Sequence, residues 1–175
     1  EIFLEKLEGK AAIIPGAKLV KHHADCEYPF RQDSNFWYLT GFDEPDAIAL
    51  FLSHKPKGER FILFVAPKDV ISEVWQGFRW GLEGAEKEFK ADKAHSINEI
   101  RDLLPGYLNG ADELVFSIGK HPSIEKIILE IFSQQIENRS RLGIGANSIK
   151  SPEIYLNEMR IITVSYTHLT LPTNC

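Results

Sequence analysis

Residues 47–66 read Ala47-Ile-Ala-Leu-Phe-Leu-Ser-His-Lys-Pro-Lys-Gly-Glu-Arg-Phe-Ile-Leu-Phe-Val-Ala66, and this stretch decides the fold class. It contains two apolar runs of strand length, about 46–53 and 59–65, on either side of a polar connection that carries Pro56 and Gly58. Proline and glycine between two apolar runs indicate a hairpin-like connection between neighbouring strands. A sheet that contains such a pair is expected to be mixed rather than purely parallel.

Helical and strand patterns alternate on both sides of this stretch. Ser96 and Glu99 have the spacing of a capping box, which predicts a helix that starts there and stops near Pro105-Gly106. Segment 123–138 carries apolar residues at the spacing of one helical face. The alternation predicts an α/β fold in which a mixed sheet is flanked by helices. The other expected elements are a helix at 1–7, strands at 10–14 and 113–118, a short helix within 69–90 and a helix from Ser151-Pro152 through Arg160.

The composition limits the classes of partner and compartment. The formal charge is −5 and no basic cluster stands out, which argues against a nucleic-acid or anionic-membrane partner. No apolar run approaches the roughly 18 residues of a membrane span, and no signal-peptide pattern is visible. Two cysteines, Cys26 and Cys175, give no disulfide framework, so we expect a cytoplasmic protein.

The sequence predicts one domain, residues 1–162, followed by a tail of different character, residues 163–175. The tail has four Thr residues, no Asp, Glu, Lys or Arg, and no helical period. We therefore expect it to be a non-native addition that does not continue the helix ending at Arg160.

The common catalytic signatures, HExxH, GxSxG and the P-loop, are absent from the sequence. Gly143-Ile-Gly145 is a weak dinucleotide signal because it follows a helix rather than a strand. His22-His-Ala-Asp-Cys26 is the one dense group of potential metal ligands. Adjacent residues of an extended segment point to opposite faces, which favours surface histidines over a metal site, and no base can be paired with Cys26 as a nucleophile. We assign no catalytic and no metal-binding residue to the chain.

The stretch 24–45 combines rigidity with polar groups. Tyr28-Pro-Phe30 is stiff because proline fixes its own φ and restricts the residue before it. Arg31-Gln-Asp33 then offers a guanidinium, an amide and a carboxylate, and Phe36-Trp-Tyr38 is expected to anchor this loop to the core. Such a loop suits a recognition surface, and it equally suits a structural loop that satisfies its own backbone.

The same stretch closely resembles the signature of the aminopeptidase P family, in the N-terminal domain. The resembling run is Glu27-Tyr-Pro-Phe-Arg-Gln-Asp-Ser-Asn-Phe-Trp-Tyr-Leu-Thr-Gly-Phe-Asp-Glu-Pro45, which matches without gaps. A second run, Glu73-Val-Trp-Gln-Gly-Phe-Arg-Trp-Gly81, is similar to the family's Trp-x-Gly-x-Arg-x-Gly pattern. Glu158-Met-Arg160 resembles the helix that leads into the family's catalytic domain.

The resemblance implies the N-terminal domain of a Xaa-Pro aminopeptidase, with a three-layer, ribonuclease-H-like mixed sheet. The family's creatinase-type catalytic domain would hold two divalent metals, commonly manganese, and remove an N-terminal residue that precedes proline. None of that domain's ligand motifs occurs in this sequence. We therefore expect the chain to be a fragment that is inactive alone and binds no metal itself.

The resemblance also implies a role and a set of site residues. The domain would shape the active-site mouth for peptides with proline at the second position, contact its own catalytic domain and build a homo-oligomer. Asp25, Trp75, Tyr28 and Arg31 would face the substrate cavity. The structural alternatives are that Asp25 caps backbone N–H groups, that Trp75 is an ordinary buried aromatic, and that Arg31 forms a salt bridge within its own loop.

Two other interpretations stay open. The chain could be a stand-alone protein-interaction module related to enzymes that have lost catalysis. It could also be the N-terminal domain of a prolidase, a Xaa-Pro dipeptidase, which shares much of this architecture. The runs Tyr28–Gly41 and Trp75–Gly81 favour aminopeptidase P.

Overall fold

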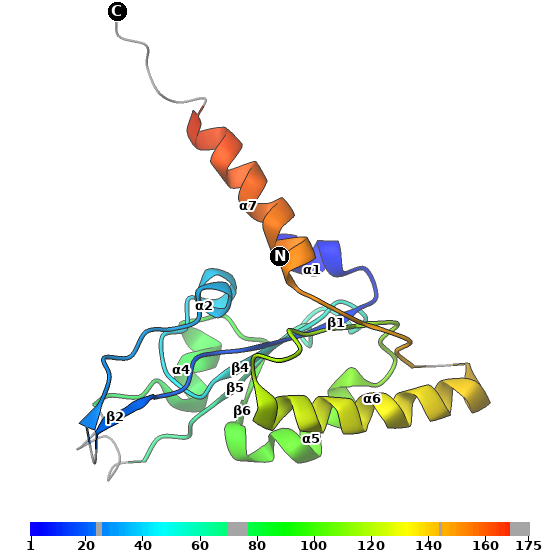
Figure 1. Ribbon diagram of the computed structural model, residues 1–175, viewed down its shortest axis with the longest axis horizontal. Helices are drawn as coiled ribbons and strands as arrows, with labels where there is room; N and C mark the ends of the chain where they lie inside the picture. Colours follow the sequence, from blue (N-terminus) through cyan, green and yellow to red (C-terminus); the bar gives the residue numbers. More distant parts are fainter. Residues whose placement is uncertain (24–25, 70–76, 144, 169–175) are drawn as a thin grey trace, which may run out of the picture.

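The computed structural model describes every residue except 24–25, 70–76, 144 and 169–175. Figure 1 shows a sheet through the middle of the molecule, with helices on both sides and one helix, α7, projecting away from it. The strands of this sheet are β1 (Ala11–Pro15), β4 (Ile48–Leu52), β5 (Phe61–Val65), β6 (Lys93–Ser96), β7 (Leu114–Val115) and β8 (Ile149–Lys150). A separate two-stranded sheet is formed by β2 (Lys21–His23) and β3 (Cys26–Glu27). The helices are α1 (Ile2–Leu7), α2 (Ser34–Thr40), α4 (Gly81–Lys87), the 3-10 turn η1 (Ile97–Glu99), α5 (Ile100–Leu108), α6 (Pro122–Leu142) and α7 (Glu153–His168).

Strand β4 makes the large sheet mixed. The strand order is β6-β5-β4-β1-β7-β8. β4 runs antiparallel to both of its neighbours, with Leu50 opposite Ile13 on β1 and opposite Ile62 on β5. The pairs β1–β7, β5–β6 and β7–β8 are parallel. The two strands predicted within residues 47–66 lie side by side, and the predicted mixed α/β sheet is confirmed.

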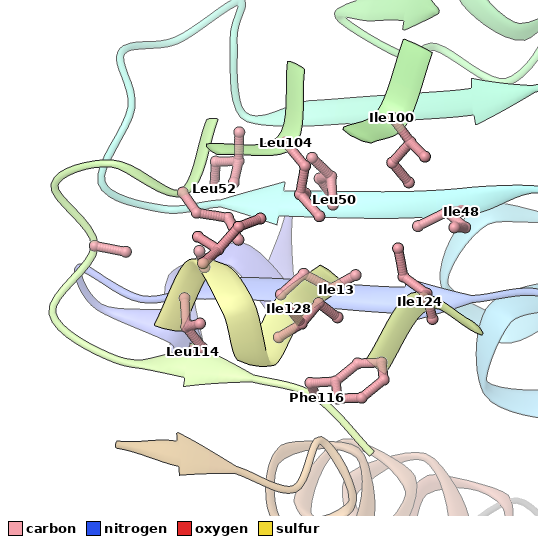
Figure 2. Close-up of a cluster of buried hydrophobic side chains, with 14 of the residues drawn as sticks. Ile13, Ile48, Leu50, Leu52, Ile100, Leu104, Leu114, Phe116, Ile124 and Ile128 are labelled. Atoms are coloured by element: carbon pink, nitrogen blue, oxygen red, sulfur yellow. The ribbon is translucent and has the colours of Figure 1, made fainter. Parts of the chain in front are cut away.

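Both faces of the central strands are buried. Every residue of β1 and β4 is buried, and successive side chains of a strand point to opposite faces. Ile13 and Leu50 pack on one face against Leu104 of α5 and Ile128 of α6 (Figure 2). The next residue of β4, Phe51, belongs to a second buried cluster on the other face, together with residues of α1, α2, α4 and α7. The fold is therefore three-layered, with the sheet between two sets of helices.

Local sequence signals set several helix ends. The capping box predicted at the start of η1 is formed: the Ser96 hydroxyl accepts from the Asn98 N–H at 3.3 Å, and the Glu99 carboxylate accepts from the Ser96 N–H at 3.2 Å. Helix α6 has Pro122 in its first turn, where the missing N–H has no helical partner to lose. It ends at Gly143, whose φ of 73° is the left-handed conformation of a helix C-cap. The weak glycine motif at 143–145 thus begins as a helix terminator.

Two predicted helix ends are wrong. Helix α5 does not stop near Pro105-Gly106 but continues to Leu108, because Leu104 and Leu108 on either side of the proline are fully buried in the core. Helix α7 does not end at Arg160 but runs to His168, so residues 163–168 continue the helix that we expected them to leave. Their assignment to a non-native tail stays a prediction. In the described part of the chain, no helix has both the length and the apolar character needed to cross a membrane.

Truncation of Leu50 tests the burial of the sheet face that α5 and α6 cover. Leu50 is fully buried on the face that α5 and α6 cover, so Leu50→Ala should lower the free energy of unfolding by about 3 kcal/mol through lost contacts and a residual cavity. Urea unfolding followed by circular dichroism measures this loss. The control, Ile154→Ala, truncates a side chain that is 55% exposed and should cost less than about 0.5 kcal/mol. Similar losses for the two variants would contradict the assigned core.

A carboxylate at the start of β7 ties this strand to β8. Glu113 accepts hydrogen bonds from the Ser148 hydroxyl at 2.8 Å and from the Lys150 ammonium at 2.9 Å. The hydrogen bond from Lys150 is the main cause that lowers the pKa of Glu113 below its ordinary value of 4.5.

This shift makes the contribution of Glu113 dependent on pH. Because its pKa is lower in the folded state, its stabilisation is present above the unfolded pKa and is lost as the pH falls through the folded pKa. The free energy of unfolding should therefore drop as the pH is lowered below 4.5, and Glu113→Gln should flatten that drop. Urea unfolding across the acid range measures both slopes, with exposed Glu83→Gln as the control. Identical slopes for wild type and Glu113→Gln would disprove the linkage.

Candidate recognition site

One glutamine holds the loop that precedes α2. The Gln32 side-chain oxygen accepts from the backbone N–H groups of Ala17 at 2.7 Å and Asp33 at 2.9 Å. Its amide nitrogen donates to the backbone carbonyls of Phe42 at 3.3 Å and Glu44 at 2.8 Å. The side chain therefore ties the segment after β1 to the segments before and after α2, and its amide uses both oxygen lone pairs and both N–H groups.

Helix α2 presents two aromatic rings to solvent. The Asp33 carboxylate caps the helix by accepting from two backbone N–H groups of the first turn, at 2.9 and 3.0 Å. The prediction that the aromatic cluster anchors the loop is correct for Phe36, which is fully buried, and wrong for Trp37 and Tyr38, which are 58% and 42% exposed. The segment is a helix, and its period turns residues 37 and 38 away from the face that buries Phe36.

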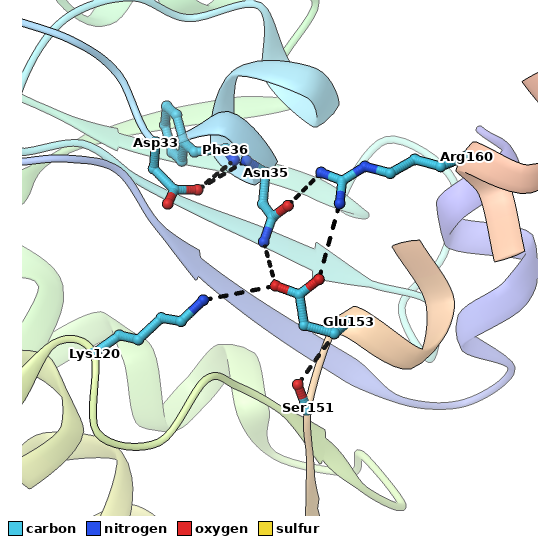
Figure 3. A network of polar contacts seen from close by, with 7 residues as sticks. All are labelled: Asp33, Asn35, Phe36, Lys120, Ser151, Glu153 and Arg160. Carbon is cyan, nitrogen blue, oxygen red and sulfur yellow. Dashed lines mark hydrogen bonds and ion pairs between the residues drawn. The ribbon is translucent and has the colours of Figure 1, made fainter. Parts of the chain in front are cut away.

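The base of α7 is joined to α2 by a polar network (Figure 3). The Asn35 amide donates to Glu153 of α7 at 2.8 Å, and its oxygen accepts from the Arg160 guanidinium at 2.6 Å. Glu153 also lies 3.9 Å from the guanidinium of Arg160 and 3.6 Å from the ammonium of Lys120. The same guanidinium lies over the ring of Tyr38, 5.7 Å from its centroid. These contacts fix the first two turns of α7 against α2.

An open pocket of about 550 Å³ lies between these elements. Its lining includes three aromatic residues, Phe30, Trp37 and Tyr38, and two arginines, Arg31 and Arg160. Tryptophan, tyrosine and arginine are the residue types that contribute most to protein–protein binding energy. We call this pocket and the exposed rings of α2 the aromatic–arginine site, and its chemistry is that of a surface for a peptide or another protein domain.

Only one of the four predicted site residues is known to line the pocket. Arg31 lines the pocket. Tyr28 is not among the lining residues; it is half-exposed, and its ring meets that of His22 edge-on at 4.5 Å between centroids. Asp25 and Trp75 lie outside the described residues. The assignment of all four to a substrate cavity stays a prediction.

No metal centre accompanies the pocket in the part of the chain that the structure describes. Among those residues, no group of three or more His, Cys, Asp or Glu side chains could hold a metal ion. His22 and His23 are both exposed on β2. The described residues therefore do not supply the ligands that a dinuclear metal site requires.

Sequence reasoning missed the polar contacts that join α2 to α7 beside the pocket. Asn35 and Glu153 meet across 118 positions of the sequence, which no local pattern reports. Helix α2 itself could have been found, because Asp33-Ser-Asn35 is a typical N-cap signal.

Removal of the Gln32 amide tests its role as the clamp of this site. Gln32→Ala should lower the free energy of unfolding by about 2 kcal/mol, because partly buried backbone groups of the clamped segments lose their partners. Gln134→Ala, on the exposed side of α6, is the matched control and should change stability by less than about 0.5 kcal/mol. Urea unfolding gives both values. If Gln32→Ala lowers the free energy of unfolding no more than the control does, Gln32 is not the clamp of this loop.

Comparison with known proteins identifies the domain. Residues 1–116 match the family model described as aminopeptidase P, N-terminal domain. The chain is 38% identical over 145 residues to the Xaa-Pro aminopeptidase of Haemophilus influenzae, covering 81% of this chain and 32% of that protein. It superimposes on aminopeptidase P from Escherichia coli, low-pH form, with a TM-score of 0.80 and 31% identity over 90% of this chain and 36% of that one.

A further solved structure is zinc-substituted E. coli aminopeptidase P in complex with product, with a TM-score of 0.74, 29% identity and coverage of 86% of this chain and 35% of that one. The chain thus spans about a third of the length of the relatives it matches. The family model covers well over half of this chain, and the six-stranded mixed sheet is that of the solved relatives. The chain belongs to the aminopeptidase P N-terminal domain family.

Proposed function

We propose that this chain is the N-terminal, non-catalytic part of a Xaa-Pro aminopeptidase, and that it provides a surface on which the catalytic domain docks. The aromatic–arginine site at the base of α7 carries the proposal. Exposed Trp37 and Tyr38 stand on a helix whose position is fixed by a buried phenylalanine, a carboxylate cap and the Gln32 clamp. A rigid surface that presents aromatic rings in this way gains binding energy at a small cost in conformational entropy.

The direction of α7 suggests which partner uses this surface. Arg160 lines the pocket and belongs to α7, and beyond it the helix leaves the body of the domain (Figure 1). In the relatives, about two thirds of the protein lies outside the region that this chain matches. A domain that continues the chain after Arg160 would be held close to the site by its tether, which raises its effective concentration. The catalytic domain is the partner that this arrangement favours.

Catalysis is assigned to that missing part. Two divalent metals, manganese in the parent enzyme, would activate water to cut before a proline at the second position of a peptide. The described residues of this chain offer no donor set for such metals, so no reaction step is assigned to them. The domain's contribution is to restrict access to the catalytic centre and to exclude bulk water from it.

Four residues complete the proposed mouth. Arg31 would pair with a carboxylate of the peptide or of the catalytic domain, and its place in the pocket lining supports this role. Tyr28, half-exposed beside β3, would extend the same wall. Asp25 and Trp75 are assigned to the cavity on the family resemblance alone. The parent enzyme is proposed to be a cytoplasmic homo-oligomer.

The activity proposal is tested with the purified chain. Incubated with manganese and a peptide that begins X-Pro, the chain should release no more N-terminal residue than buffer does, because its described side chains do not form a metal cage. Chromatographic detection of the released amino acid is the measurement, and E. coli aminopeptidase P is the positive control. Release above the buffer rate that a chelator abolishes would overturn the assignment.

A graft tests the docking surface. Residues 1–162 of this chain, placed in the E. coli enzyme instead of the third that the chain matches, should support release from an X-Pro peptide. Trp37→Ala with Tyr38→Ala in the graft should lower the rate about tenfold, because the two rings supply contact area to the catalytic part. Leu129→Ala, 41% exposed on α6 across the sheet, is the matched control and should have no effect. A folded graft that releases nothing, or a control that is as damaging, would refute the docking role.

A further inference from the structure

Strand β6 forms one edge of the large sheet, where a strand normally leaves a row of backbone groups unpaired. It pairs in parallel with β5 on its inner side, and among the described residues no strand of the sheet follows it on the outer side. Backbone groups two residues apart on a strand point the same way. An open edge of this kind is a template for pairing with another chain.

Two carboxylates occupy this edge. The Ala94 N–H donates to Glu86 of α4 at 3.0 Å, and the Ser96 N–H donates to Glu99 of η1 at 3.2 Å. Ala94 and Ser96 are two residues apart, so both N–H groups face the side away from β5. Hydrogen bonds to a charged acceptor are stronger than those between neutral groups. The carboxylates also place two negative charges where an incoming strand would lie.

The edge would otherwise suit a second copy of the same strand. If two β6 strands meet in antiparallel orientation about a two-fold axis at His95, Ala94 of each copy faces Ser96 of the other. Such a pairing sets the outward N–H and C=O groups of Ala94 in one copy opposite those of Ser96 in the other, which is a hydrogen-bonded pair of an antiparallel ladder. A surface that complements itself in this way is what a two-fold dimer requires. Elsewhere on the sheet, the opposite edge strand β8 has only two residues and offers a shorter template.

We propose that the outer edge of β6 is a latent strand-pairing surface whose partner is a second copy of this chain, and that Glu86 and Glu99 keep it closed. The inference is independent of the docking role of the aromatic–arginine site, which lies at the base of α7. Loss of the two carboxylates exposes two N–H groups and removes the repulsion between copies.

Self-association of an opened variant tests the proposal. Glu86→Ala with Glu99→Ala should raise the association constant about tenfold over wild type in sedimentation velocity, because each freed N–H gains a partner in the dimer. Glu86→Gln with Glu99→Gln keeps both acceptors and should show a smaller increase. Glu83→Ala, which removes an exposed carboxylate from the same helix α4, should behave as wild type. A folded opened variant that associates no more than wild type would overturn the proposal.

Two further measurements separate edge pairing from general loss of stability. In the opened variant, Ala94→Pro removes one N–H and should return association to the wild-type level, whereas association through another surface would persist and contradict the proposal. Amide hydrogen exchange of Ala94 should be faster than in wild type at low concentration and slower as dimers form. Glu86→Ala alone leaves the Ser96–Glu99 capping box intact, so it tests the same edge if the double variant is poorly folded.

Discussion

The burial of strand β4 on both faces is the constraint on which the rest of the structure depends. Its side chains alternate between two cores, so neither face of the sheet can be left to water. Helices α5 and α6 cover one face. The other face draws on distant parts of the sequence, because Phe3 and Leu7 of α1 and Leu156 of α7 belong to the same buried cluster. The first and last described helices are therefore neighbours, and the Lys6–Glu158 ion pair at 2.8 Å lies between them.

The aromatic–arginine site follows from this covering of the sheet. Burial of Phe36 fixes which side of α2 faces the core, and the helical period then turns Trp37 and Tyr38 outward. The burial of Leu156 places the base of α7 beside α2, where Arg160 reaches both Asn35 and the ring of Tyr38. The site needs no special loop of its own. It is the outer surface of two helices that the sheet holds in place.

The sequence was sufficient for features that depend on local patterns. The strands within 47–66, the capping box at Ser96 and the long helix that begins near residue 123 were all predicted from spacing alone. Strands β6 and β8 were not, because they are two to four residues long and lack a clear apolar alternation. Helix α2 was missed for a related reason: seven residues are too few to show a helical period, and its aromatic residues suggested an anchored loop.

Long-range polar contacts are the part of the site that no sequence pattern could supply. Asn35 and Arg160 are 125 positions apart and meet only because the sheet brings α2 and α7 to one face. The family resemblance identified the domain and the stretch that carries the site. It did not show that Gln32, which lines the pocket together with Arg31, is also the structural clamp of the loop. Adjacent residues of one motif can thus have different roles, which only their contacts reveal.

The two proposed interaction surfaces of the domain differ in whether their binding groups are open to solvent or covered. At the aromatic–arginine site, large rings remain in water although burial would be favourable, which is the usual mark of a surface that receives a partner. At the β6 edge, polar backbone groups that could accept any extended strand are covered by Glu86 and Glu99. Side-chain surfaces discriminate between partners through shape and charge, whereas a strand edge discriminates poorly because every backbone carries the same groups. If the aromatic–arginine site receives the catalytic domain as proposed, the domain benefits from keeping this surface open and the β6 edge closed.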